Sequence, residues 1–202
     1  MRRAFLVCGP ACAGVRLVLA TRNAHKLREF ATLLIPHEIV ELPTGVVLPP
    51  ETGDTFAANA LEKARTAARA TGLASIADDS GIEAAALGGA PGVRSARFAG
   101  EDATDAENLA KLLREAPPGS PLAYVCALAY VGADGGERLL EGRCTGTLDP
   151  RPRGSGGFGY DPAFLPDDIA DGRTMAELDP AEKDAISHRG RAARALLAVL
   201  DS

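Results

Sequence analysis

The chain has 202 residues, of which 46% are hydrophobic and 24% charged, the balance of an ordinary globular protein that can bury a full core. Its formal net charge of −5 argues against a general nucleic-acid-binding protein, which needs a basic face to displace counterions from phosphates. The longest apolar runs are too short to cross a bilayer and no Cys-x-x-Cys pair occurs, so we expect a cytoplasmic protein with reduced thiols that binds neither membrane nor nucleic acid.

The first residues differ in pattern from the rest of the chain. Arg2 and Arg3 precede a short apolar run, as at the start of a signal peptide, but Gly9-Pro10 interrupts that run. We therefore predict that residues 1–14 are a disordered extension and that residues 15–202 form a single domain.

The next segment predicts a strand followed by two helices. Residues 16–20 form a short apolar run typical of a buried strand, and apolar residues at helical spacing follow it until Pro36. Asn23 stands where the N-cap of this helix is expected. A second helix is predicted at about residues 55–71, and Gly72 ends it.

An acidic segment, Asp78-Asp79-Ser80-Gly81, directly follows an apolar run at residues 73–77. We interpret it as a turn at the end of a short strand, with the two carboxylates pointing in different directions because side chains alternate along an extended backbone. Carboxylates at a strand end suit Mg²⁺, which takes few protein oxygens and keeps water and substrate phosphates as its other ligands. Asp, Ser and Gly are also common turn formers, so these residues alone support a metal site and a plain turn equally.

The second half of the chain predicts a third helix, a β-hairpin and a helical C-terminus. Thr104-Asp105-Ala106-Glu107 is a capping box that opens a helix. Residues 121–131 and 137–148 are predicted to be antiparallel strands joined by a tight turn. A glycine-rich loop is predicted over residues 154–161, and helix after Pro180. Together these elements predict an α/β fold with an antiparallel component in its second half.

The loop between the first strand and the first helix has features of a phosphate site. It ends at a helix N-terminus, whose free N–H groups and dipole favour an anion. Thr21 and Asn23 add short hydrogen-bonding side chains, and Lys26 adds a cation one turn later. The segment lacks the Gly-x-x-x-x-Gly-Lys-[Ser/Thr] of a P-loop, so taken alone it is better explained as a capped helix with a solvated lysine.

Other candidate ligand-binding side chains lie in loops and in the C-terminal region. Glu51 precedes the second helix and could bring another carboxylate to the strand ends. The segment Phe158–Asp161 places an aromatic ring beside a carboxylate, which suits a planar base. Lys183, His188 and Arg189 lie in the C-terminal helical region. Each has an ordinary structural explanation, but a phosphate cradle, metal-binding acids and a base clamp in one chain together indicate a nucleotide site.

These residues resemble the inosine triphosphate pyrophosphatase family, and the resemblance extends from about Arg16 to the C-terminus. The six matching motifs are, in chain order, Thr21-Arg22-Asn23-Ala24-His25-Lys26; Glu51-Thr52-Gly53 with Phe56 and Asn59; Ala77-Asp78-Asp79-Ser80-Gly81; Leu87-Gly88-Gly89-Ala90-Pro91-Gly92 with Ser95-Ala96-Arg97; Gly156-Gly157-Phe158-Gly159-Tyr160-Asp161-Pro162; and Glu182-Lys183 with Ser187-His188-Arg189-Gly190. One departure is Arg22, where many relatives carry Gly. Its guanidinium either helps to bind phosphate or lies outside the cleft.

The resemblance implies a fold, an assembly and an activity. The fold is α/β, with a long central mixed sheet flanked by helices and two lobes that hold the nucleotide in the cleft between them. The assembly is a homodimer. The activity is Mg²⁺-dependent hydrolysis of dITP, ITP and XTP to the nucleoside monophosphate and pyrophosphate, which cleanses the nucleotide pool.

The resemblance also implies a role for each matching residue. The triphosphate would be held by Thr21, Arg22, Asn23, Ala24, His25 and Lys26. The metal ligands would be Glu51 and Asp79, and Asp79 would also be the general base for attack of water on the α-phosphorus. Ser80 would contact the substrate. The base would be bound by Phe158, Gly159, Tyr160, Asp161, Lys183, His188 and Arg189.

Base selectivity is expected to depend on the purine 6-position. Cations such as His188 and Arg189 can donate to a 6-keto oxygen, whereas the amino group of adenine presents a donor that would be left unpaired. The sequence does not indicate which group rejects guanine.

Two other functions are compatible with these residues. One is a pyrophosphatase for triphosphates with standard or pyrimidine bases, which a substrate panel would distinguish. The other is a nucleotide-sensing protein without catalysis, against which the intact Glu51, Asp79 and Lys26 argue.

Overall fold

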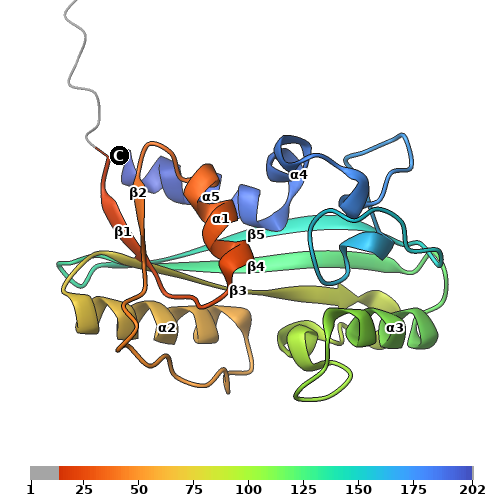
Figure 1. The fold of residues 1–202 in the computed structure, drawn as a ribbon, viewed down its shortest axis with the longest axis horizontal. Helices are drawn as coiled ribbons and strands as arrows, with labels where there is room; N and C mark the ends of the chain where they lie inside the picture. The colour runs from red at the N-terminus through yellow and green to blue at the C-terminus, as the bar shows by residue number, and fades with distance from the viewer. Residues whose placement is uncertain (1–13, 202) are drawn as a thin grey trace, which may run out of the picture.

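The centre of the molecule is a six-stranded mixed sheet with the strand order β2-β1-β3-β4-β5-β6 (Figure 1). The structure, a computed structural model, describes residues 14–201. Strand β1 pairs in parallel with β2 and β3, and the remaining pairs are antiparallel. The strands are β1 (Arg16–Leu19), β2 (Glu38–Glu41), β3 (Ser75–Ala84), β4 (Pro121–Val131), β5 (Glu137–Leu148) and β6 (Phe164–Pro166). The predicted extension, apart from Gly14, lies outside the described residues.

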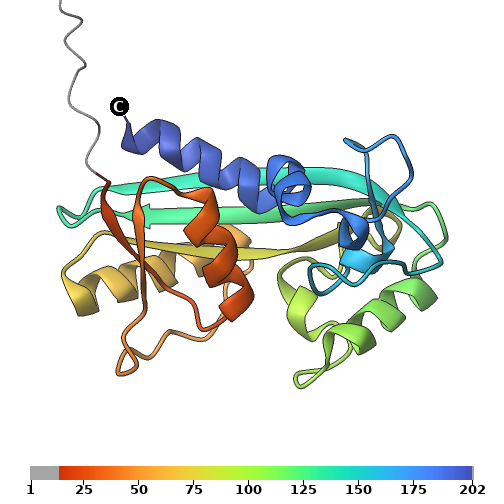
Figure 2. The same ribbon diagram turned by 45° about the horizontal axis from the view of Figure 1, so that its top comes forward.

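Helices cover both faces of this sheet. They are α1 (Ala24–Leu33), α2 (Phe56–Thr71), α3 (Asp105–Glu115), α4 (Pro180–Ile186) and α5 (His188–Leu200). Helix α2 packs on one face of β3 and β4, while α1 and α5 lie on the opposite face and α5 runs along β4 and β5 (Figures 1 and 2). Helix α3 lies toward the far end of the long strands, beside the short 3₁₀ turn η2 (Gly92–Arg97). The predicted α/β fold, a long mixed sheet flanked by helices, is confirmed.

Strand β3 separates two apolar cores by the alternation of its side chains. Ile76 packs in a cluster that includes Phe30 of α1. Its neighbour Ala77 packs in a different cluster, with Ala60 and Ala64 of α2. Because successive side chains of a strand point to opposite faces, one strand can bury apolar residues against both layers of helices.

Most helices and strands begin and end where local sequence signals predict. The Asn23 side chain accepts hydrogen bonds from the first turn of α1, and Gly72 ends α2 in the left-handed conformation at φ 68°. Thr104 and Glu107 form the predicted capping box of α3. Strands β4 and β5 coincide with the two predicted strands of the hairpin.

The predicted acidic turn is wrong, because Asp78-Asp79-Ser80-Gly81 lies inside β3. Ten residues of β3 pair with β4, and this ladder passes through the acidic segment without a break. The cross-strand hydrogen bonds therefore override the turn preference of Asp, Ser and Gly. Position 81 requires glycine because of close packing and not because of a turn. A Cβ there would approach the Gly92 carbonyl to 2.6 Å and would collide with Ser95.

Two of the cysteines lie in the core. Cys126 and Cys144 are buried and free, and burial raises the pKa of both thiols above the ordinary value. Cys8 and Cys12 lie outside the described residues. No helix between residues 14 and 201 is both long and apolar enough to cross a membrane.

Candidate active site

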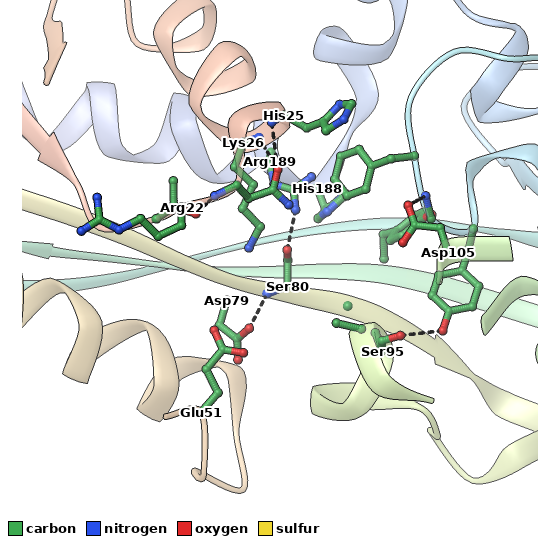
Figure 3. Close-up of a pocket in the computed structure, with 18 of the residues that line it drawn as sticks. Arg22, His25, Lys26, Glu51, Asp79, Ser80, Ser95, Asp105, His188 and Arg189 are labelled. Atoms are coloured by element: carbon green, nitrogen blue, oxygen red, sulfur yellow. Dashed lines mark hydrogen bonds between the residues drawn. The ribbon is translucent and has the colours of Figure 1, made fainter. Parts of the chain in front are cut away.

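A cavity of about 430 Å³ opens beside the middle of β3 (Figure 3). This is a typical volume for a small-molecule site. Every site residue proposed from the sequence lines it except one: Thr21, Arg22, Asn23, His25, Lys26, Glu51, Asp79, Ser80, Phe158, Gly159, Tyr160, Asp161, Lys183, His188 and Arg189. The exception is Ala24, which is exposed at the first position of α1 and does not line the cavity. Adjacent helix positions point in different directions, and the role expected of Ala24 stays a prediction.

The alternation of side chains along β3 sends its two aspartates to opposite faces of the sheet. Asp78 and Ser80 share the face covered by α1 and α5, and the Ser80 hydroxyl donates to Asp78 Oδ2 at 3.1 Å. Asp79 lies on the face covered by α2, where Asn59 contacts it. The expected divergence of the two carboxylates is therefore present, in a strand instead of a turn.

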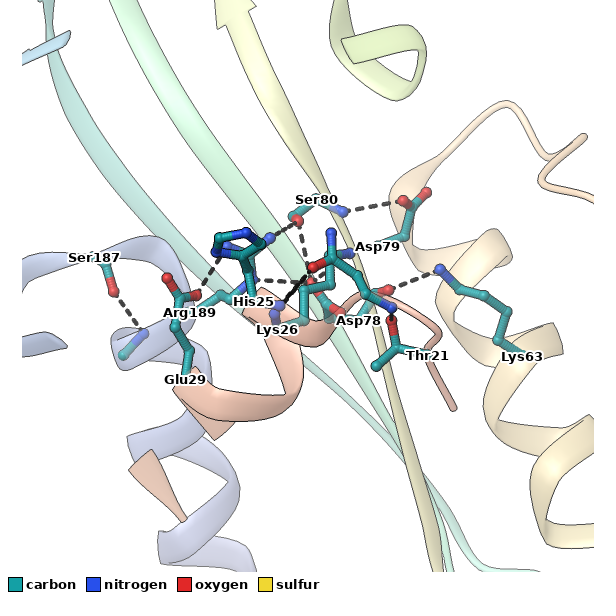
Figure 4. A network of polar contacts seen from close by, with 12 residues as sticks. Thr21, His25, Lys26, Glu29, Lys63, Asp78, Asp79, Ser80, Ser187 and Arg189 are labelled. Atoms are coloured by element: carbon teal, nitrogen blue, oxygen red, sulfur yellow. Dashed lines mark hydrogen bonds and ion pairs between the residues drawn. The ribbon is translucent and has the colours of Figure 1, made fainter. Parts of the chain in front are cut away.

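Asp78 is the centre of a buried network of ion pairs (Figure 4). It is 1% exposed, and its Oδ2 lies 3.0 Å from Lys26 Nζ and 3.2 Å from Arg189 Nε. Burial alone would raise the pKa of Asp78, but the charges of Lys26, Arg189 and Lys63 hold it well below its usual range. Asp78 therefore stays ionised and fixes two cations in the wall of the cavity.

Asp79 is oriented by uncharged donors. Asn59 Nδ2 donates to its Oδ2 at 2.9 Å, and the Ser80 backbone N–H donates to its Oδ1 at 3.0 Å. Burial raises the pKa of Asp79; the charge of Lys63 opposes this rise and the Glu51 carboxylate adds to it. A carboxylate with a fixed orientation and a raised pKa is suited to accept a proton.

Lys63 of α2 connects the acidic residues. Its ammonium group donates to the Glu51 carboxylate and, at 2.8 Å, to the Asp78 backbone carbonyl. Burial lowers the pKa of Lys63, but the charges of Asp78, Glu51 and Asp79 outweigh that effect and raise it. Arg97 also donates to the Glu51 backbone carbonyl at 3.2 Å, so the loop that carries Glu51 is held at two points.

Glu51 and Asp79 together could hold a divalent cation. Figure 3 shows both carboxylates on the same side of β3. Two carboxylates suit Mg²⁺, which completes its octahedral shell with water and substrate phosphates. Among residues 14–201, no group of three or more His, Cys, Asp or Glu side chains forms a preassembled metal cage. The donor set therefore fits a cation that the substrate helps to bind, as Mg²⁺ does in phosphoryl-transfer sites.

Arg22 does not extend into the cavity with its charged group. The guanidinium donates to the backbone carbonyls of Leu42, Pro43 and Val46 at 2.7 to 2.8 Å. Figure 3 shows it directed away from the other labelled side chains. Of the two alternatives for Arg22, the structure favours the one in which the guanidinium lies outside the cleft.

The glycine-rich loop is closed on itself by Asp161. The Asp161 Oδ2 atom accepts from the Phe158 backbone N–H at 2.9 Å and from Lys183 Nζ at 2.9 Å. Gly157, at φ 68°, allows this closure, because a Cβ there would collide with the Asp161 carboxylate.

Two further contacts tie the same loop to α3 and η2. The Gly159 backbone N–H donates to Asp105 Oδ2 at 2.9 Å. The Tyr160 hydroxyl, which is buried, donates to the Ser95 carbonyl at 2.7 Å. The two residues that follow Phe158 are therefore fixed to α3 and η2.

Two cations from the C-terminal helices share one acid. Glu29 of α1 accepts from Lys183 Nζ at 3.1 Å and from Arg189 Nη1 at 3.1 Å. Arg189 Nη2 also donates to Ser80 Oγ at 2.6 Å. Burial lowers the pKa of Lys183, but the charges of Asp161 and Glu29 outweigh burial and raise it. Both cations are thus held ionised beside the aromatic loop.

His188 differs in charge from the expectation. Its ring stacks on Tyr124, with centroids 4.7 Å apart and planes inclined by 7°. Burial, followed by the charges of Arg189 and Lys183, holds the pKa of His188 well below its usual range. The lowered pKa favours the neutral form of His188, which argues against the expected role of this side chain as a cation.

Comparison with known proteins places this chain and its fold in a family. Residues 17–199 match the model of the Ham1 family. The chain belongs to the Ham1 family. The Ham1 protein from Coxiella burnetii has a solved structure that matches with a TM-score of 0.82 and 43% identity over 93% of this chain and 98% of that one.

Curated relatives in the Ham1 family carry a functional name. A dITP/XTP pyrophosphatase of Mycobacterium tuberculosis is 50% identical, over 93% of this chain and 96% of the relative. A dITP/XTP pyrophosphatase of Mycolicibacterium paratuberculosis is 49% identical, over 92% of this chain and 96% of the relative.

Several residues of this Ham1 family site have no role in the sequence-based prediction. They are Glu29, Asn59, Lys63 and Asp105. The sequence does contain a sign that Lys63 belongs to the site. Lys63 follows Asn59 by one helical turn and adjoins the apolar stripe of α2, where a solvated lysine is unexpected. The sequence contains no such sign for Glu29, because its partners lie more than 150 residues away in the sequence.

Proposed function

We propose that this Ham1 family member hydrolyses dITP, ITP and XTP to the nucleoside monophosphate and pyrophosphate. The observation that carries the proposal is one cavity that joins three kinds of group. Two carboxylates that suit a metal lie on one side, buried cations lie beside them, and an aromatic loop lies at the other end. The name shared by the mycobacterial relatives supports the same substrates.

Glu51 and Asp79 are the residues that would hold Mg²⁺. When bound, Mg²⁺ supplies positive charge that neutralises phosphate oxygens. Asp79 accepts a proton from the water that attacks the α-phosphorus, and Asn59 fixes the orientation of its carboxylate. Lys26 and Lys63 present positive charge to the triphosphate from the two sides of β3.

The base is recognised by the other end of the cavity. Phe158 provides an aromatic face, and Lys183 and Arg189 lie 5.3 Å and 5.2 Å from its ring centroid. Both cations are donors only, so they can satisfy a 6-keto oxygen and leave the amino group of adenine without an acceptor. His188 contributes as a neutral side chain.

The proposal extends to features that follow from the family resemblance. We infer a homodimer, a nucleotide cleft between two lobes, and a cytoplasmic protein. Sedimentation of the purified protein at micromolar concentration would test the dimer directly.

A substrate panel tests the activity. Pyrophosphate release is measured from dITP, ITP, XTP, dGTP, ATP and dCTP, with Mg²⁺ and with excess EDTA. We expect release from the first three, dependence on Mg²⁺, and discrimination against ATP of about 10⁴-fold in kcat/KM. Cleavage of ATP at a rate comparable with ITP would overturn the account of the base pocket.

A further inference from the structure

His25 lies against the aromatic loop instead of the acidic residues. It is the second residue of α1, and its ring centroid lies 5.2 Å from that of Phe158, with the planes inclined by 41°. In Figure 3 His25 lies at the opposite end of the cavity from Glu51 and Asp79. The family resemblance implies that His25 holds the triphosphate, but this position is at the end of the cavity that we propose for the base.

The spacing of the two rings leaves no room for a base between them. Stacked bases in a duplex repeat about every 3.4 Å, so a base between two rings needs about 7 Å. The observed centroid separation is 5.2 Å, and the rings are tilted. A nucleoside that packs on this side of Phe158 must therefore first separate the pair.

Of the three groups that pack on the Phe158 ring, His25, Lys183 and Arg189, His25 is the exposed one. Lys183 and Arg189 are 8% and 3% exposed, and both are held by Glu29. His25 is exposed, and its Nδ1 contacts Nη2 of Arg28, which is also exposed, at 2.9 Å. Its backbone N–H is already used by the Asn23 cap at 2.8 Å, so the side chain is what it offers to a ligand.

We propose that His25 is a nucleoside-contacting residue, which forms with Phe158 an aromatic gate that opens to admit the nucleoside and then packs against it. This inference rests on the proposed function for the identity of the ligand. It assigns His25 to the specificity of the nucleoside end and leaves the triphosphate to Lys26 and Lys63.

Product inhibition separates the two roles of His25. Inosine monophosphate carries the nucleoside, and inorganic tripolyphosphate carries only the phosphates. With ITP as substrate and Mg²⁺ present, His25→Ala should weaken inhibition by inosine monophosphate about 5- to 20-fold and leave inhibition by tripolyphosphate unchanged. His25→Phe should restore most of the loss because it keeps a ring. Weaker tripolyphosphate inhibition with unchanged monophosphate inhibition would overturn the proposal.

A fluorescent variant detects the contact without turnover. The natural sequence has no tryptophan, so His25→Trp introduces a single fluorophore at the gate. Addition of inosine monophosphate should change its emission, and addition of tripolyphosphate should not. Thr32→Trp, exposed on α1 and outside the cavity lining, is the matched control and should respond to neither. An unchanged His25→Trp emission at saturating monophosphate would contradict the proposal. Failure of the wild-type protein to cleave ITP would instead overturn the proposed function.

Discussion

Asp78 and Asp79 are adjacent in the chain but differ in charge environment because they lie on opposite faces of β3. Asp78 is surrounded by cations that lower its pKa. Asp79 accepts from an amide donor and lies near both the Lys63 ammonium and the Glu51 carboxylate, and burial raises its pKa. The strand geometry therefore gives one carboxylate a structural role and leaves the other available for chemistry.

Replacement of Asp79 should remove catalysis with little loss of binding. Asp79→Asn keeps the size of the side chain but removes the proton acceptor, so kcat for ITP should fall by about 10²- to 10⁴-fold. Inhibition by inosine monophosphate should be largely retained. Asp54→Asn, an exposed acid near Glu51, is the control and should retain activity. An Asp79→Asn enzyme within tenfold of wild type, well short of the hundredfold that is roughly the smallest loss expected of a general base, would argue against this role.

Replacement of Asp78 should instead affect stability. Asp78→Asn leaves the buried Arg189 and the half-buried Lys26 without their shared counterion, although Glu29 still pairs with Arg189. Breaking a buried ion pair on one side typically costs several kcal/mol, so we expect the free energy of unfolding to fall by about 3 kcal/mol. Urea denaturation followed by circular dichroism measures this. A loss below about 1 kcal/mol, the range of exposed pairs, would show that the network contributes little.

At the scale of elements, the loops around the cavity are positioned by side chains that contact backbone atoms. Arg22 holds the segment at residues 42–46, Arg97 holds the Glu51 carbonyl, and Asp105 holds the Gly159 N–H. Loops expose unpaired backbone groups, and charged side chains satisfy those groups strongly.

The Arg22 contacts give a prediction that distinguishes a loop anchor from a phosphate ligand. Arg22→Ala should lower the free energy of unfolding by about 1 to 2 kcal/mol, since hydrogen bonds to charged groups contribute on this scale. Amide exchange at residues 42–46 should accelerate, while inhibition by tripolyphosphate stays unchanged. Arg69→Ala, an exposed arginine of α2, should change neither quantity. Weaker tripolyphosphate inhibition in Arg22→Ala would restore the phosphate-binding alternative.

The helices and strands also show which features of the fold can be predicted from local sequence patterns. Helix caps and the hairpin are local signals, and Asn23, Thr104 and the strands β4 and β5 lie where the sequence predicts them. The acidic segment depends on pairing with β4, about 50 residues later, and local preference gives the wrong answer there. Contacts such as Glu29 with Arg189 follow only from the packing of α1 against α5.

At the scale of the whole molecule, the cavity concentrates charge in the interior. Asp78, Lys26, Arg189, Glu29 and Lys183 form a continuous chain of ion pairs between β3, α1, α4 and α5. Buried ion pairs gain little net stability over apolar packing, so such a network is weak support for stability as its purpose. Its effect is to hold three cations, Lys26, Arg189 and Lys183, in the wall of the cavity, and each of them is paired with a carboxylate.

This concentration of positive charge around His188 predicts a pH dependence of folding. His188 has a depressed pKa in the folded protein because of burial and the nearby charges of Arg189 and Lys183, and it regains an ordinary pKa near 6.5 on unfolding. Below pH 6.5 the unfolded chain therefore binds a proton that the folded protein does not, and stability falls as the pH is lowered. His188→Phe keeps a ring against Tyr124 and cannot be protonated. Between pH 7 and pH 5, the wild type should lose about 2 kcal/mol more of its free energy of unfolding than His188→Phe does. Urea denaturation at half-unit pH steps measures both curves, and parallel curves would mean that His188 is protonated equally in the folded and unfolded states.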